Sequence, residues 1–152
     1  NKAKFKNKDK LFFLDKYYKP ELPLNLTKYL LKFANCSIDI SDGLIDDLAK
    51  MINRQSLSFH LFENKIPVSN NLNNLIKKQR LNKINLISNG DDYQVLFTAD
   101  NNKARIIQKA SKTTGIKITK IGKIVSGKDM SLIFDQKDKQ IQAKSKGYIH
   151  QF

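Results

Sequence analysis

The stretch Asp39-Ile40-Ser41-Asp42-Gly43-Leu44 lies where an apolar run gives way to an amphipathic segment. Residues 36–40 place Cys, Ile and Ile at alternate positions, which predicts a short buried strand. From Leu44 to Ile52 the apolar residues recur at helical spacing, which predicts a helix. One hydroxyl and two carboxylates therefore occupy the turn between a strand and a helix.

Two interpretations of this turn follow from its chemistry. The first amide groups of a helix are unpaired and carry partial positive charge, so phosphate oxygens can dock there, while carboxylates beside them can hold the Mg²⁺ that accompanies nucleotide phosphates. The alternative is a capped helix start, because Ser and Asp are preferred there, and Asp46 and Asp47 suit the positive end of the helix dipole.

Two further segments favour the phosphate interpretation. Residues 88–93, Ser-Asn-Gly-Asp-Asp-Tyr, place an acidic pair directly before the predicted strand 93–98. Near the C-terminus stands Gly147-Tyr148-Ile149-His150. Each has a simpler interpretation: Asp91 and Asp92 also suit an ordinary turn, and Tyr148 also suits a core position.

In this order, the three segments resemble the C-terminal half of the thiamine-monophosphate kinases, within the aminoimidazole ribonucleotide synthetase-like superfamily. The family pattern is Asp-Ile-Ser-Asp-Gly-Leu before a helix, Gly-Gly-Glu-Asp-Tyr-Glu before Leu-Phe-Thr, and a final Gly, aromatic residue and His-Phe. The resemblance covers about residues 18–152, with Asn89 in place of Gly and Asp91 in place of the longer Glu. Selenophosphate synthetase and aminoimidazole ribonucleotide synthetase itself carry different Gly-rich signatures and are weaker matches.

The resemblance implies ATP-dependent phosphorylation of thiamine monophosphate to thiamine diphosphate, with Mg²⁺ between the two anionic substrates. It implies that Asp39 and Asp42 bind Mg²⁺, that Ser41 touches the ATP phosphates, and that Asp91 and Tyr148 contact the thiamine substrate. The acceptor phosphate is already ionised at pH 7, so no catalytic base is assigned. Alternatives are another ATP-using enzyme of the superfamily, or a basic nucleic-acid-binding module.

With 152 residues, 40% of them hydrophobic, the chain is expected to form a single α/β (α+β) domain with one mixed sheet covered by helices. Predicted helices span 24–33, 44–54, 71–80 and 101–112; predicted strands span 36–40, 57–62, 93–98, 116–125, 130–134 and 140–143.

The division into domains follows the resemblance. Residues 1–17 are expected to be a basic, frayed lead-in, and residues 18–152 the C-terminal domain of a thiamine-monophosphate kinase-like protein, as a fragment, a split-gene product or the remnant of a broken gene. In the family the N-terminal domain supplies most metal-binding aspartates and most of the homodimer contact. The chain alone is therefore expected to be inactive.

The net charge of +14 is of the kind that attracts nucleic acids. Only three of the 28 basic residues are Arg, however, and the Lys residues are spread along the chain, which argues against a nucleic-acid partner. Cys36 is the sole cysteine, so no intramolecular disulfide can form. No apolar stretch approaches membrane-spanning length, and a cytoplasmic location without a membrane partner is expected.

Overall fold

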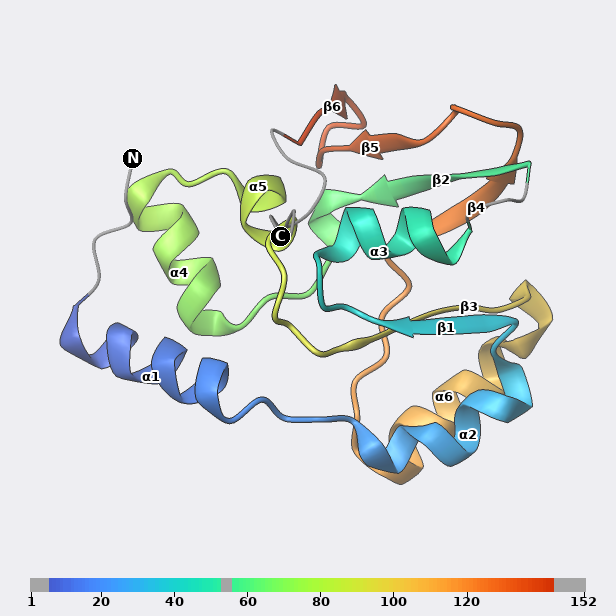
Figure 1. The fold of residues 1–152 in the computed structure, drawn as a ribbon, viewed down its shortest axis with the longest axis horizontal. Helices are drawn as coiled ribbons and strands as arrows, with labels where there is room; N and C mark the ends of the chain where they lie inside the picture. Colours follow the sequence, from blue (N-terminus) through green and yellow to red (C-terminus); the bar gives the residue numbers. More distant parts are fainter. Residues whose placement is uncertain (1–5, 53–55, 144–152) are drawn as a thin grey trace, which may run out of the picture.

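The computed structural model describes residues 6–52 and 56–143 (Figure 1). Its helices are α1 (Asn7–Tyr18), α2 (Thr27–Phe33), α3 (Leu44–Met51), α4 (Asn70–Gln79), α5 (Lys83–Ile87) and α6 (Ala104–Thr114). Its strands are β1 (Cys36–Asp39), β2 (Leu57–Phe62), β3 (Val95–Thr98), β4 (Gly122–Ser126), β5 (Leu132–Phe134) and β6 (Gln140–Ile141). Short 3₁₀ turns, Leu24–Leu26 and Asn101–Lys103, lead into α2 and α6, and a third, Glu63–Lys65, follows β2.

The described strands form two sheets. β1 and β3 make an antiparallel ribbon, and the second sheet has the order β4-β2-β5-β6. This second sheet is mixed, because β2 runs antiparallel to β4 but parallel to β5. The predicted α/β class with a mixed sheet is confirmed, but the strands divide between two sheets where one was expected. Apolar alternation marks which residues are strands without specifying which strands pair.

The β1–β3 ribbon separates two apolar clusters. Successive side chains of a strand face opposite ways, and the neighbours Leu96 and Phe97 on β3 accordingly belong to different clusters. Leu96 belongs to the larger one, with residues of α3, α5, β2 and β5. Phe97 packs on the smaller one, which joins α2 to α6. Figure 1 shows α3 on one side of the ribbon and the α2–α6 pair on the other.

Residues 116–121 differ from the sequence prediction. They were expected to begin a strand, but β4 starts only at Gly122. Ile116 and Ile118 pack on the smaller cluster and Ile121 on the larger one. The alternation of apolar residues here therefore reflects an extended connection that contributes side chains to two cores and reaches β2 only at its end, where the Phe62 amide donates to the Ile121 carbonyl at 2.9 Å.

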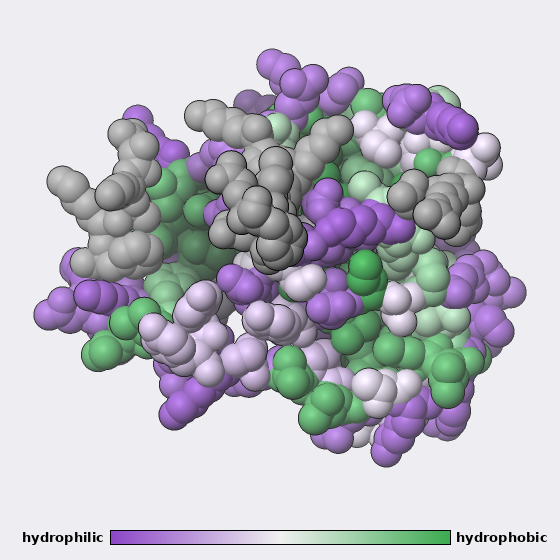
Figure 2. All heavy atoms as spheres, in the orientation of Figure 1, coloured by the Kyte–Doolittle hydropathy of each residue, from purple (hydrophilic) through white to green (hydrophobic). Residues whose placement is uncertain are grey.

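Two described helices were not predicted, α1 and α5. Helix α1 lies in the segment expected to be a frayed lead-in, and none of its residues is buried. Leu11, Tyr17 and Tyr18 on it are exposed, and hydrophobic surface is visible along the lower part of the molecule, over the region of α1 and α2 (Figure 2). Among the described helices, none combines the length and apolar character needed to cross a membrane.

Candidate functional site

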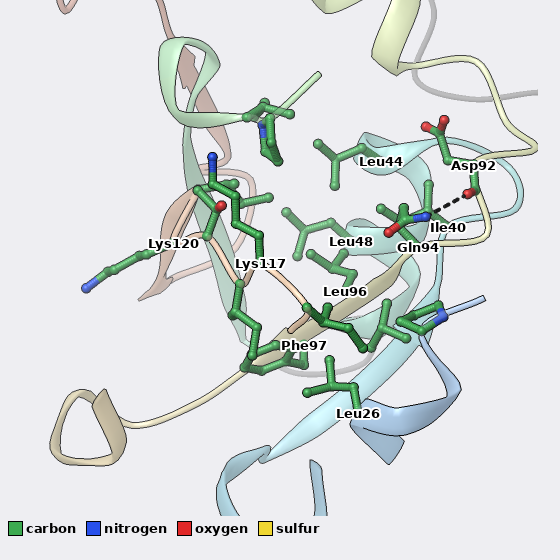
Figure 3. A pocket seen from close by; sticks show the side chains of 18 of the residues that line it. Leu26, Ile40, Leu44, Leu48, Asp92, Gln94, Leu96, Phe97, Lys117 and Lys120 are labelled. Atoms are coloured by element: carbon green, nitrogen blue, oxygen red, sulfur yellow. Dashed lines mark hydrogen bonds between the residues drawn. The ribbon is translucent and has the colours of Figure 1, made fainter. Parts of the chain in front are cut away.

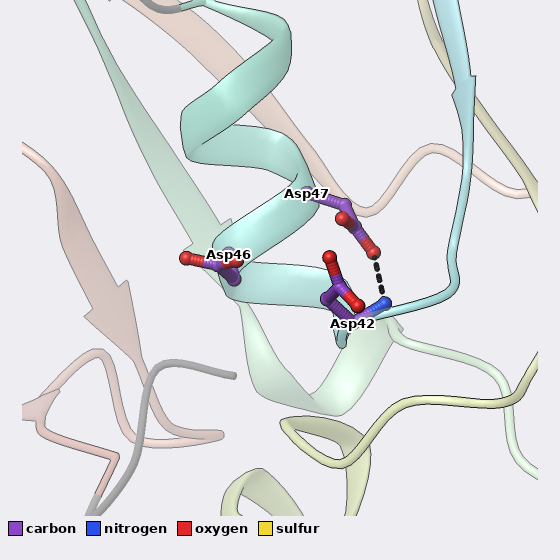
Figure 4. Close-up of side chains that lie close together, drawn as sticks. All are labelled: Asp42, Asp46 and Asp47. Atoms are coloured by element: carbon purple, nitrogen blue, oxygen red, sulfur yellow. Dashed lines mark hydrogen bonds between the residues drawn. The ribbon is translucent and has the colours of Figure 1, made fainter. Parts of the chain in front are cut away.

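The turn after β1 is organised by the carboxylate of Asp47. One of its oxygens, Oδ2, accepts hydrogen bonds from the backbone amides of Ser41, Asp42 and Gly43, at 2.9, 2.9 and 3.1 Å. The Asp47 residue is only 1% exposed, and Figure 4 shows its carboxylate directed at the loop amide. Convergent successive amides are typical of anion-binding turns. In this chain the anion is an internal side chain.

This arrangement bears on both sequence interpretations of the turn. The sequence placed phosphate at the first amides of the helix, which begins at Leu44, whereas Asp47 binds the amides of the three residues before it, Ser41, Asp42 and Gly43. Capping by a Ser or Asp side chain is wrong, because the N-cap residue of α3 is Gly43, with φ of 123°. The side chains of Ser41 and Asp42 in this turn are partly exposed.

Asp42, Asp46 and Asp47 form a carboxylate cluster, with one oxygen from each lying within 4.8 Å of the others. The Lys50 ammonium pairs with all three: with Asp42, with Asp46 at 2.7 Å and with Asp47 at 3.4 Å. Hydrogen bonds to Asp42 and then to Asp46 raise the pKa of Lys50. Three carboxylates against one ammonium leave the cluster with a net negative charge.

The acidic residues of this cluster differ from those predicted to bind the metal, which were Asp39 and Asp42. Asp46, interpreted as favourable to the helix dipole, also pairs with Lys50. Asp39, predicted beside Asp42 as a metal ligand, lies exposed at the end of β1 and does not belong to the carboxylate cluster found among the described residues. Asp47 and Lys50 were missed as members of the site, and the available signal was an Asp beside the apolar face of an amphipathic helix with a Lys three residues later.

The second acidic segment lies directly against this turn. The Asp91 amide donates to the Ser41 carbonyl at 2.9 Å, and the Tyr93 amide donates to the Ile40 carbonyl at 2.8 Å. Gly43 fits against Ser88, since a Cβ added to Gly43 would stand 2.2 Å from the Ser88 carbonyl oxygen. The structure thus brings together the two segments, 39–44 and 88–93, that the sequence analysis singled out.

Asp91 and Tyr93 hold left-handed backbone conformations, with φ of 68° and 51°. Such conformations are uncommon for residues other than glycine and cluster at functional sites. The Tyr93 hydroxyl donates to Asp91 Oδ1 at 3.2 Å. The Asp91 charge is the main cause that raises the pKa of Tyr93, and Asp39 adds a smaller effect. The charges of Asp39 and Asp91 therefore both act on the Tyr93 hydroxyl.

Asp92 lies beside a large, open cleft of about 1920 Å³. Figure 3 shows Asp92 and Gln94 near one another, with apolar side chains of α3 and β3 forming much of the wall and Lys117 and Lys120 on another side. Desolvation and then the Asp91 charge raise the pKa of Asp92 to about 6. Tyr148, the remaining predicted site residue, lies outside the described residues.

Comparison with models of known protein families gave no match. The chain is similar to several curated thiamine-monophosphate kinases. It is 33% identical to that of Buchnera aphidicola subsp. Schizaphis graminum over 141 residues, 91% of this chain and 42% of the relative. It is 34% identical to that of Aquifex aeolicus over 89 residues, 58% of this chain and 29% of the relative. The chain thus spans less than half the length of these relatives.

Solved structures of thiamine-monophosphate kinases also match this chain. Thiamine monophosphate kinase from Aquifex aeolicus matches with a TM-score of 0.65 and 26% identity, over 93% of this chain and 44% of that one. AaThiL complexed with AMPPCP and TMP matches with a TM-score of 0.68 and 26% identity, over 96% and 43%. The hydrogenase maturation protein HypE of E. coli, at 14% identity, TM-score 0.62 and coverage of 78% and 37%, shares the fold alone. By sequence and by fold, the chain resembles the thiamine-monophosphate kinases over less than half of their length.

Proposed function

We propose that this chain is the C-terminal part of an enzyme that transfers the γ-phosphoryl group of ATP to thiamine monophosphate, giving thiamine diphosphate. The observation that carries the proposal is the backbone pairing of segments 39–44 and 88–93 in a chain that resembles this family. The structure of AaThiL complexed with AMPPCP and TMP supports the choice of ligands.

In this proposal the turn after β1 serves the phosphates of ATP. Asp39 and Asp42 are assigned to Mg²⁺ because carboxylate oxygens are among its preferred ligands, and the Asp42 carboxylate already binds one cationic group, the Lys50 ammonium. When bound, Mg²⁺ supplies neutralisation of the phosphate charge and alignment for in-line transfer. Ser41, partly exposed in the same turn, is assigned to the ATP phosphates.

The second segment serves the acceptor. Thiamine carries a cationic thiazolium and a flat aminopyrimidine, which a carboxylate and an aromatic face can hold. Asp91 is assigned to this contact, and the hydrogen bond from Tyr93 orients its carboxylate. Tyr148 is assigned as the aromatic partner. The acceptor phosphate is ionised at pH 7, so none of these residues is given the role of a general base.

The remaining ligands of the proposed site belong to the part of the relatives that this chain does not cover. We assign them to an N-terminal domain, which in the completed protein also supplies the homodimer contact. Two sets of phosphates need more cationic neutralisation than one acidic turn can organise. Residues 1–152 alone are therefore proposed to be inactive, and the completed enzyme to be a cytoplasmic kinase.

The test is an assay of thiamine diphosphate formation with ATP and Mg²⁺. Residues 1–152 are compared with a fusion in which the N-terminal part of the Buchnera relative precedes this chain, and circular dichroism verifies the folding of both. Product from the fusion only is the expected result. Product from the isolated chain contradicts the division of the site, whereas a folded, ATP-binding fusion that phosphorylates a different acceptor contradicts the substrate.

A further inference from the structure

We infer that Asp47 is a positioning residue, whose buried carboxylate fixes the backbone of the acidic turn so that the side chains of Ser41 and Asp42 face outward. Nothing in the sequence pattern or in the resemblance assigned Asp47 this role. The inference rests on the proposed function only for the nature of the cation at Asp42.

The contacts of Asp47 are those of a built anion site. Amides of three successive residues converge on Oδ2, at 2.9 to 3.1 Å, and Lys50 Nζ lies 3.4 Å from Oδ1. A buried carboxylate without partners is strongly unfavourable, whereas charge-assisted hydrogen bonds to several donors stabilise its ionised form. The turn and the carboxylate therefore depend on one another.

The direction of the neighbouring side chains follows from this contact. An amide directed at Asp47 fixes the peptide plane of its residue, and the side chains of Ser41 and Asp42 remain partly exposed while Asp47 is only 1% exposed. A cation at Asp42 can thus be approached from solvent, whereas Asp47 Oδ2 is enclosed by the turn. Groups that orient a metal ligand in this way commonly change metal affinity by about 10- to 100-fold when they are replaced.

The same contact excludes one way of binding phosphate. In many nucleotide-binding turns the amides themselves hold the phosphate. In this chain Asp47 occupies those amides, and a second anion there would meet its negative charge. Nucleotide phosphate is accordingly expected to avoid these three amides and to reach the turn through side chains, a cation or the first amides of α3, from Leu44 on.

The first experiment observes the amides directly by ¹H–¹⁵N NMR of residues 1–152. In the unmodified chain the amides of Ser41, Asp42 and Gly43 should exchange slowly with solvent and resonate downfield, as expected for charge-assisted bonds. Asp47→Asn, which keeps the size of the side chain and removes its charge, should move all three upfield. Asp46→Asn, the matched control on the neighbouring residue, should leave them unchanged.

The second experiment titrates the same proteins with Mn²⁺ alone and follows paramagnetic broadening of the Asp42 signal. Asp47→Asn should weaken Mn²⁺ binding about tenfold, and Asp46→Asn less than about threefold. Fast exchange of the three amides in the unmodified chain overturns the inference even if Asp47→Asn does not fold. Unmoved amides in Asp47→Asn, or moved amides with unchanged Mn²⁺ affinity, also overturn it. An unmodified chain that does not bind Mn²⁺ contradicts the metal assignment of the proposed function, and the amide shifts then decide the positioning role.

Discussion

The backbone of Gly90 lies so close to the Ser41 carbonyl that a Cβ added to Gly90 would stand 2.0 Å from the carbonyl oxygen. The amide of the next residue, Asp91, donates to that same oxygen at 2.9 Å. Glycine at position 90 is therefore what allows the two acidic segments to meet through their backbones, and this contact fixes where Asp91 stands relative to the turn that carries Asp42.

Gly90→Ala is expected to destabilise the chain by about 3 kcal/mol, because a methyl group cannot fit against the Ser41 carbonyl without moving backbone. Gly115→Ala is the matched control: its φ is 70°, but no atom lies within 4 Å of an added Cβ. It should cost only about 1 kcal/mol, from the left-handed conformation. Urea unfolding of both variants measures the difference. Equal losses would show that the close approach at Gly90 is unimportant.

Asp42→Asn should lower kcat/KM of the completed enzyme by about 100-fold or more, since it removes a carboxylate proposed to hold the cation between the phosphates. Asp46→Asn removes the same charge from the same cluster but breaks only a partly exposed i,i+4 pair with Lys50, so a loss below about fivefold is expected. Steady-state kinetics at saturating Mg²⁺ compares the two variants. Similar losses of kcat/KM in both variants would show that Asp42 is no more important to catalysis than Asp46.

The stability of the chain should depend on pH through Asp92. Its pKa is raised from 3.8 to about 6, so between these values the folded chain binds more protons than the unfolded chain, and stability falls as the pH rises. Asp92→Asn should remove this dependence and stabilise the chain at pH 7. Asp92 as a whole residue is exposed although its carboxylate is partly desolvated, so solvent screening limits the expected gain to about 1 kcal/mol.

Asp135→Asn is the control of opposite sign. Amides of Lys137 and Lys139 bond the Asp135 carboxylate at 2.7 and 3.0 Å and lower its pKa. Its contribution is therefore present above the unfolded-state pKa and is lost as the pH falls through the lower folded-state value. Urea unfolding between about pH 3 and about pH 7 distinguishes the two carboxylates. A stability curve for Asp92→Asn that parallels the unmodified chain would contradict the assignment.

Tyr148→Ala in the completed enzyme should raise KM for thiamine monophosphate about five- to thirtyfold, the effect of losing one aromatic contact to a cationic ring. The KM for ATP should stay nearly unchanged, and Tyr148→Phe should be mild because the ring carries the proposed contact. Parallel increases in both KM values would place Tyr148 outside the acceptor site, and unfolding of the Ala variant would identify it as a core residue.

Local patterns predicted much of the fold. Helical spacing from Leu44 located α3, and apolar alternation located β2 with its observed bounds, Leu57–Phe62. The predicted helix 101–112 corresponds to the turn Asn101–Lys103 and α6, which ends at the left-handed C-cap Gly115. These features depend on neighbours in sequence, so the sequence alone carries them.

What could not be predicted depends on contacts between distant residues. Asp47 looks like a favourable charge in the first turn of a helix until the preceding turn folds back so that its amides meet the carboxylate. The isoleucines of 116–121 look like a strand until two separate cores are known to receive them. The five residues of α5 are too few to give a helical period, although Asn82, which caps it through the Asn85 amide, was an available signal.

The antiparallel pairing of β1 with β3 has a consequence for how this chain acquires its structure. Cys36 and Thr98, which face each other in that ribbon, are 62 positions apart. Pairing across such a distance closes a long loop and is characteristic of slow folding steps. During synthesis the first acidic turn therefore leaves the ribosome well before its partner segment. The strand β1 can form its ribbon only after β3 has emerged.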